Sequence, residues 1–121
     1  MLKKLFHIYN FFLLIIYLYP GSIIGYILFK DFSKQPQITS DFMSLSSNHL
    51  YVFIILSILG VLSFKHSTNI VIYLILISLF LELLHIFIPN RSFEFGDLFG
   101  NLIGVIIPLI LSKIYKIWRI K

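Results

Sequence analysis

Four long apolar stretches, separated by short polar segments, run through this chain of 121 residues. They cover about residues 5–19 (or on to 29), 50–64, 70–88 and 98–112. Each approaches the roughly 20 residues with which a helix crosses about 30 Å of hydrocarbon, and tilt or local thinning accommodates the short last one. The pattern therefore predicts an all-α fold, an integral membrane four-helix bundle that forms a single domain over residues 1–121.

The far end of the first helix is open to two interpretations. Pro20, Gly21 and Ser22 interrupt the apolar run, which resumes as far as Phe29. Proline removes a backbone hydrogen bond but is tolerated in membrane helices, so the helix either stops at Pro20 or bends there and continues. A basic start before an apolar run is also typical of a signal peptide. Because the sequence contains no alanine for a cleavage site, we expect an uncleaved anchor.

The basic residues gather at the ends of the apolar runs, so the net charge of +5 predicts a membrane orientation and no nucleic-acid partner. Segment 30–48 is predicted to be an extracytoplasmic loop and segment 65–69 a cytoplasmic hairpin turn. With both termini cytoplasmic, seven basic residues lie inside and three outside, as the positive-inside rule requires. The inner set is Lys3, Lys4, Lys65, Lys113, Lys116, Arg119 and Lys121, and the outer set is Lys30, Lys34 and Arg91.

Composition agrees with a membrane protein. The chain is 59% hydrophobic and only 12% charged, too few charged residues to cover the exterior of a soluble domain of this size. Cysteine is absent, which excludes disulfides, thiolate metal sites and a cysteine nucleophile. Neither a glycine-rich phosphate loop nor a zinc-binding histidine pair is present. We therefore expect no cofactor and no metal.

Polar side chains inside two of the apolar runs are the main candidates for function. An ionisable group at membrane depth costs at least about 2.5 kcal/mol and usually faces a partner or a cavity. Glu82 is the clearest case. The third and fourth runs each carry one polar stripe at positions i, i+4, i+7 and i+11, the spacing of one helix face. The stripes are Ser78, Glu82, His85 and Pro89, and Asp97, Asn101, Gly104 and Pro108.

The short connection 89–98 makes these two helices antiparallel neighbours, with their stripes at similar depth. We expect a polar pocket that opens to the outer face. Arg91 at its mouth is placed to pair with Glu82 or Asp97, or to bind the phosphate of a lipid. Gly104 is expected to let the third and fourth helices approach closely. The predicted pocket residues are Glu82, His85, Arg91, Asp97, Asn101 and His49.

Each of these residues also has a purely structural interpretation. Glu82 can form an interhelical pair with Arg91 or His85. Asp97 can cap the start of its helix, and His49 the start of the second. An asparagine in a membrane helix can bond to a neighbouring backbone. Residue types and spacing leave these alternatives open beside a role in binding or chemistry.

The stretch LELLHIFIPNRSFEFGDLFGNLIGVIIP resembles the signature of VanZ-like membrane proteins. His49, within SSNHLYVF, resembles the histidine that follows the first loop in that family. The resemblance covers about residues 48–108, roughly half the chain. It departs from the pattern at Leu45-Ser46, where the family has an Asp-Lys pair, and at His85, where glutamine is usual. The matching positions are Glu82, His85, Pro89, Arg91, Asp97, Asn101 and Gly104.

This resemblance implies a multi-pass protein of the bacterial cell membrane with a role at the cell envelope, since the founding member of the family is associated with low-level resistance to the glycopeptide teicoplanin. No established reaction comes with it. The leading hypothesis is a protein that binds a membrane lipid, a lipid phosphate or a lipid-linked cell-wall precursor. An intramembrane enzyme acting on a phosphorylated lipid and a small transporter subunit are the alternatives. Oligomeric state stays open.

Overall fold

The computed structural model describes the backbone of residues 1–120 and the side chains of residues 1–116. Its regular secondary structure is all helix, and no β-strand occurs within this part of the chain. The all-α class predicted from the sequence is confirmed. Arg119 and Lys121, which entered the charge count, lie outside the side chains described. The helices are α1 (Leu2–Leu18), α2 (Ile23–Phe29), α3 (Ser47–Phe64), α4 (Thr68–Leu84) and α5 (Phe95–Ile120).

The first apolar stretch forms two helices. α1 ends at Leu18, and α2 is bent away from it by 79°. Ser22 begins the short helix, where its hydroxyl oxygen accepts a hydrogen bond from the backbone N–H of Gly25 at 2.9 Å. A break between two helices leaves backbone N–H groups at the start of the second helix without partners. The Ser22 cap satisfies one of these groups, so the chain can turn at Pro20 instead of continuing as one straight helix.

The third predicted run ends earlier than expected and the fourth extends further. α4 stops at Leu84, not at residue 88, and a tight turn follows in which Asn90 takes a left-handed conformation (φ 60°). Pro89 favours this end, because the residue before a proline is disfavoured in helical geometry. α5 already begins at Phe95, so the connection between these helices, residues 85–94, lies four residues earlier in the chain than the predicted one.

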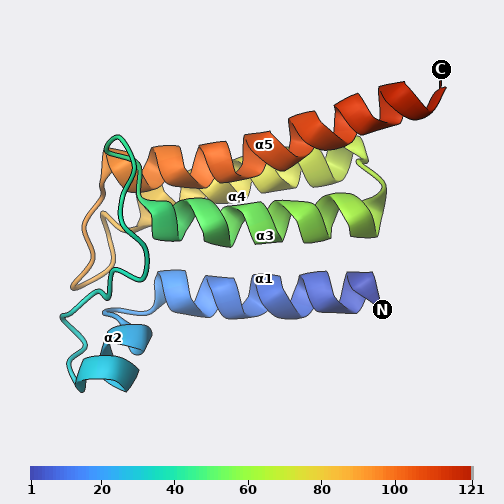
Figure 1. Ribbon diagram of the computed structural model, residues 1–121. Coiled ribbons are helices and arrows are strands. Elements are labelled where there is room, and N and C mark those ends of the chain that lie inside the picture. Colours follow the sequence, from blue (N-terminus) through green and yellow to red (C-terminus); the bar gives the residue numbers. More distant parts are fainter. Residues whose placement is uncertain (121) are drawn as a thin grey trace.

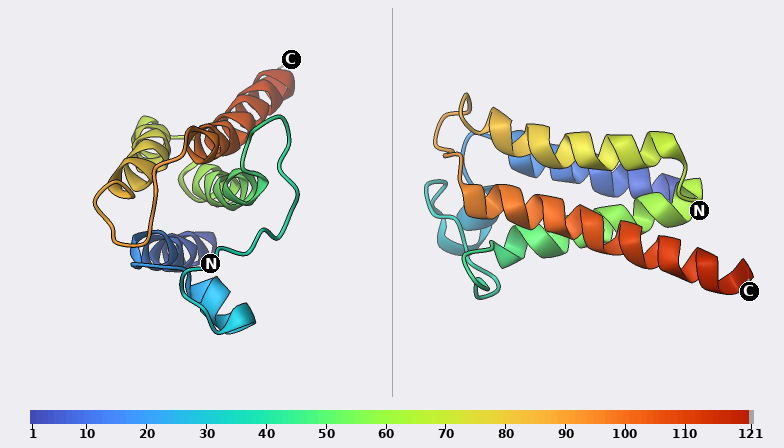
Figure 2. Two further views of the ribbon diagram at one scale, coloured as in Figure 1. Left: turned by 90° about the vertical axis from the view of Figure 1, so that its left-hand side faces the viewer. Right: turned by 90° about the horizontal axis from the view of Figure 1, so that it is seen from above.

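The four long helices α1, α3, α4 and α5 lie side by side, and the two ends of the chain lie at the same end of the assembly (Figures 1 and 2). α2 and the loop that follows it lie at the opposite end. α3 packs most extensively on α5, and both α3 and α4 also contact α1. The centre is filled by fully buried Phe53, Leu56, Leu74 and Val105, which come from three of the four long helices.

Glycines on one face of α5 allow the close contact with α3. A Cβ atom on Gly104 would lie 2.6 Å from the carbonyl oxygen of Leu50 and 2.8 Å from Cβ of Phe53. One turn earlier, a Cβ on Gly100 would lie 2.7 Å from the carbonyl oxygen of Ser46. Gly104 thus faces α3, the second predicted span. The prediction that Gly104 would contact the third predicted span, α4, was wrong. The connecting turn makes α4 and α5 neighbours, but it does not decide which face of α5 meets each helix.

Among the residues that the structure describes, two helices are long and apolar enough to cross a membrane: α3, and α5 over Phe95–Lys116. The bent pair of α1 and α2 adds a third if it is counted as one span, while α4 is apolar but has only 17 residues. Large apolar side chains such as Phe11, Ile58 and Phe80 are exposed on the outer faces of the helices. Water would oppose such a surface, so these features agree with a membrane protein.

Candidate functional site

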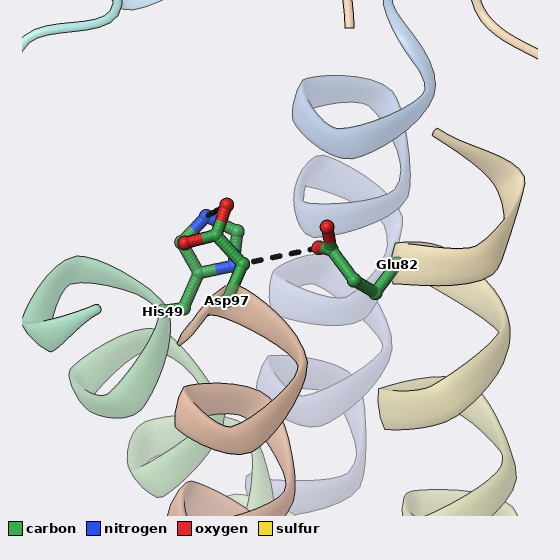
Figure 3. Close-up of side chains that lie close together, drawn as sticks. All are labelled: His49, Glu82 and Asp97. Atoms are coloured by element: carbon green, nitrogen blue, oxygen red, sulfur yellow. Dashed lines mark ion pairs between the residues drawn. The ribbon is translucent and has the colours of Figure 1, made fainter. Parts of the chain in front are cut away.

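The long helices bring polar side chains together at the end of the assembly where α2 lies. Tyr17 is in the last turn of α1, Glu82 is in the last turn of α4, and His49 and Asp97 are in the first turns of α3 and α5. Figure 3 shows His49, Glu82 and Asp97 converging from three helices. An arrangement in which two helices begin where two others end places these four residues at one level.

Asn101, which is fully buried, connects the four helices. Its side-chain oxygen accepts a hydrogen bond from the Tyr17 hydroxyl at 3.2 Å and lies 3.0 Å from Nδ1 of His49. Its amide nitrogen donates to the carbonyl oxygen of Ser78 at 3.3 Å. Since the amide nitrogen is the donor toward α4, the oxygen faces His49, whose Nδ1 therefore carries the proton in this contact. The asparagine orients the imidazole.

Glu82 is fully buried, and its two carboxylate oxygens have different surroundings. Oε1 accepts a hydrogen bond from the backbone N–H of Glu94 at 3.1 Å. Oε2 accepts no hydrogen bond, although Nδ1 of His85 lies 3.3 Å away and Nδ1 of His49 3.9 Å away. His85 donates from Nε2 to the carbonyl oxygen of Tyr17 at 3.1 Å, because a carbonyl can only accept. One carboxylate oxygen thus faces two imidazoles without a hydrogen bond.

Asp97 completes the cluster from the α5 side. Its Oδ2 lies 3.4 Å from Nε2 of His49, and its position in the first turn of α5 suits a carboxylate, since the start of a helix carries a partial positive charge. His49, Glu82 and Asp97 each offer one potential metal-ligand atom, and these atoms all lie within 4.8 Å of one another. The expectation of no metal rested on motifs local in sequence, whereas these three residues meet only in the fold.

Arg91 does not form the ion pair with Glu82 or Asp97 that the sequence suggested. Its Nη2 donates to the carbonyl oxygen of Ile16 at 2.7 Å, and its Nε donates to that of Tyr19 at 3.4 Å. These carbonyls belong to the end of α1, where backbone acceptors lack helical partners and a cation is favoured. Partial burial lowers the pKa of Arg91 from its usual value. The guanidinium stays charged, because arginine does not lose its proton in proteins.

A cavity of about 270 Å³ lies beside Arg91, between α1, α2, the following loop and α3. Asn48 holds the loop in place, since its amide donates to the carbonyl oxygen of Pro36 at 3.1 Å and its oxygen accepts from the Thr39 backbone at 3.2 Å. The walls are largely apolar, with polar groups from a few side chains. The lining residues are Ile16, Tyr17, Ser22, Ile24, Gln35, Pro36, Ile38, Thr39, Asn48, His49, Tyr51, Val52 and Arg91.

The structure thus gathers five of the six predicted pocket residues and places the sixth, Arg91, apart from them. Glu82, His85, Asp97, Asn101 and His49 share one cluster. Arg91 lies beside the cavity at the end of α1, and Gly104 lies at the α3–α5 contact.

Tyr17 was missed by the sequence analysis. It falls on the same face of α1 as the buried Phe6 and Leu13, at i+11 and i+4 from them. That spacing would have marked its hydroxyl as buried and in need of a partner. The roles of the Ser78 carbonyl and the Glu94 N–H had no such signal, because backbone groups carry no sequence signature.

Comparison with known proteins provides no further guide to the site. No family model, no curated protein and no solved structure matches this chain.

Proposed function

We propose that this protein is a membrane protein that binds the anionic headgroup of a lipid in the cavity beside Arg91. The observation that carries this proposal is the lining of that cavity, in which one guanidinium and the imidazole of His49 accompany mostly apolar walls. Arginine matches the geometry of phosphate oxygens, and apolar walls accommodate the adjoining acyl or prenyl chain. The volume of about 270 Å³ suits a headgroup rather than a whole lipid.

The proposal includes four membrane spans, with both termini on the cytoplasmic side of a bacterial membrane. α1 and α4 have 17 residues each, the lower end of the range that spans a bilayer. Both chain ends lie at one end of the molecule, the end predicted to be cytoplasmic from its basic residues (Figure 1). The cavity then opens toward the outer leaflet. Reporter fusions after Lys65 and Lys121 should be cytoplasmic and those at Ser40 and Phe93 external; an external Lys121 contradicts this orientation.

Membership of the VanZ-like family is part of the same proposal. It is supported by the convergence of His49, Glu82, Asp97 and Asn101, which lie far apart in sequence but belong to the resemblance. A role at the cell envelope follows from the family. Expression in a susceptible Gram-positive bacterium should raise the inhibitory concentration of teicoplanin, and Arg91→Ala should abolish the increase. An unchanged inhibitory concentration with wild-type protein in the membrane would count against this part.

Native mass spectrometry of the purified protein tests lipid binding directly. We expect the wild-type spectrum to show one anionic phospholipid or polyprenyl phosphate per chain, and Arg91→Ala to lose it while Arg91→Lys retains part. Lys4→Ala is the control: it removes one positive charge at the end of the helix bundle opposite to the cavity, and it should leave lipid binding intact. Since Arg91 also contacts α1, Val52→Phe provides a second variant that fills the cavity but keeps the guanidinium. Equal lipid occupancy in all four variants would refute the proposal.

The same purified protein also tests two alternative functions, an enzyme and a transporter. His49 lines the cavity and also lies beside the carboxylates of Glu82 and Asp97, which is the arrangement an acid–base enzyme would need. Conversion of the bound phosphorylated lipid into a lighter product, dependent on Glu82 or Asp97, would indicate an enzyme. Accumulation of a labelled solute in vesicles that contain the protein would instead indicate a transporter.

A further inference from the structure

We propose that His49, Glu82 and Asp97 form a binding site for a divalent transition-metal ion such as Zn²⁺ or Mn²⁺. The three residues come from α3, α4 and α5, and one ligand atom from each lies within 4.8 Å of the others (Figure 3). One imidazole nitrogen and two carboxylate oxygens suit these ions better than Ca²⁺ or Mg²⁺, which prefer oxygen ligands alone. This inference does not depend on the proposed lipid binding.

The buried carboxylate of Glu82 points independently to a ligand. The residue is fully buried, and its Oε2 accepts no hydrogen bond, while Oε1 is already occupied by the Glu94 N–H. A buried carboxylate oxygen without a hydrogen bond is unfavourable, and a bound ion is one of the partners that accounts for such a group. Oε2 faces the two histidines inside the cluster, and it has room in its coordination for an ion.

His49 is oriented as metal-binding histidines commonly are. Nδ1 donates its proton to the side-chain oxygen of Asn101, which leaves the lone pair of a neutral imidazole on Nε2. Nε2 faces Oδ2 of Asp97 at 3.4 Å. Two ligands held at about 2.1 Å by one tetrahedral ion also lie roughly 3.4 Å apart. A lone pair that faces a carboxylate at this distance is repulsive unless a cation or a proton lies between them.

The third ligand needs a small adjustment. Glu82 faces the other nitrogen of His49 at 3.9 Å, so its carboxylate must shift toward Nε2 to bind an ion there. The hydrogen bond from Glu94 comes from a loop, which can follow this movement more readily than a helix. Because Asp97 and His49 are partly exposed and His49 also lines the cavity, an ion has access to the site.

The competing explanation is an ion-pair network without metal. Protonated His49 and His85 would also balance the charges of Glu82 and Asp97, through the same three contacts. His85 is a positioning residue in either case, since its Nε2 is held by the carbonyl oxygen of Tyr17. The two explanations differ in one measurable respect: only the first requires an ion to bind with defined stoichiometry.

Isothermal titration calorimetry decides between a metal site and an ion-pair network. The full chain is purified in detergent without lipid, and bound metal is first removed with a chelator. With ZnCl₂ or MnCl₂ we expect one ion per chain. Asp97→Asn and Glu82→Gln should each weaken binding by at least about 10-fold, and Asn101→Ala by about 10-fold through loss of imidazole orientation. Glu94→Gln keeps its backbone N–H, and His7→Gln alters an exposed histidine of α1; both should bind as the wild type does.

Co²⁺ provides a second readout, because coordination at this site should produce visible absorption bands that disappear in Asp97→Asn. If Glu82→Gln does not fold, the partly exposed Asp97 still allows the test, with circular dichroism to verify folding. Absence of stoichiometric binding to any of these ions, or equal binding in Asp97→Asn and the wild type, would overturn the proposal. Loss of binding in His7→Gln would also overturn it, by assigning the ion to a surface site. Failure of lipid binding would leave these results unaffected, so the two proposals are tested separately.

Discussion

Replacement of Gly104 by alanine tests the packing on which the polar cluster depends. The added Cβ would lie 2.6 Å from the carbonyl oxygen of Leu50 and 2.8 Å from Cβ of Phe53. Both atoms are fixed to the backbone of α3, so neither can move away by a change of rotamer. Ordinary van der Waals contact begins near 3.4 Å, so α3 and α5 must separate by about 0.8 Å at this point.

The cost of this separation follows from three contributions. Overpacking of a closely packed contact costs about 1–3 kcal/mol. The hydrogen bond from the Ser57 hydroxyl to the carbonyl oxygen of Val105, now 3.1 Å long, would be stretched beyond bonding distance, at about 1 kcal/mol. Alanine recovers about 1 kcal/mol through its higher helix propensity. We therefore expect Gly104→Ala to lower the free energy of unfolding by about 2 kcal/mol.

Thermal unfolding in one detergent, followed by circular dichroism, measures the effect. A loss of about 2 kcal/mol corresponds to a melting temperature lower by roughly 8 °C in a chain of this length. Gly60→Ala is the matched control. The three atoms nearest to a Cβ there are side-chain atoms of Ile70, Phe6 and Leu74 at 3.2–3.3 Å, which can adjust, so its melting temperature should stay close to that of the wild type. Equal melting temperatures for the two variants would refute the reasoning.

Three further changes probe other contacts. Tyr17→Phe removes the hydroxyl bonded to Asn101 and should cost about 1 kcal/mol in the same assay; an unchanged melting temperature would contradict that hydrogen bond. Ser22→Ala removes the cap of α2 and should speed amide exchange over residues 23–29 without altering the global melting temperature, because α2 lies outside the packed bundle of long helices; unaltered exchange would contradict the cap. Two hydrogen bonds from Ser33 lower the pKa of Asp31, so their contribution to stability is present above the ordinary pKa of aspartate and is lost as the pH falls through the lowered one. NMR titration should show this lowered value and its return toward normal in Ser33→Ala; an ordinary value in the wild type would contradict the turn.

The sequence by itself determined the helical class and the approximate position of each long helix. Apolar runs of this length can satisfy their backbone groups in lipid only by forming helices, so composition and run length suffice. The helix ends were less predictable. The bend before α2 depends on the cap at Ser22, and the end of α4 at Leu84 depends on the turn around Pro89. Such ends are decided by a few hydrogen bonds and backbone angles, which the hydrophobic pattern does not record.

The polar stripes predicted which faces of α4 and α5 point inward, because helical periodicity relates residues of one helix to one another. Only the tertiary structure decided the partners of those residues. It directed Gly104 toward α3, placed Arg91 on the carbonyls of α1, and brought Tyr17 to Asn101. Likewise, the meeting of His49, Glu82 and Asp97 depends on how α3, α4 and α5 are rotated and offset against one another. Those relations arise from packing between helices distant in sequence, and periodicity within one helix carries no information about them.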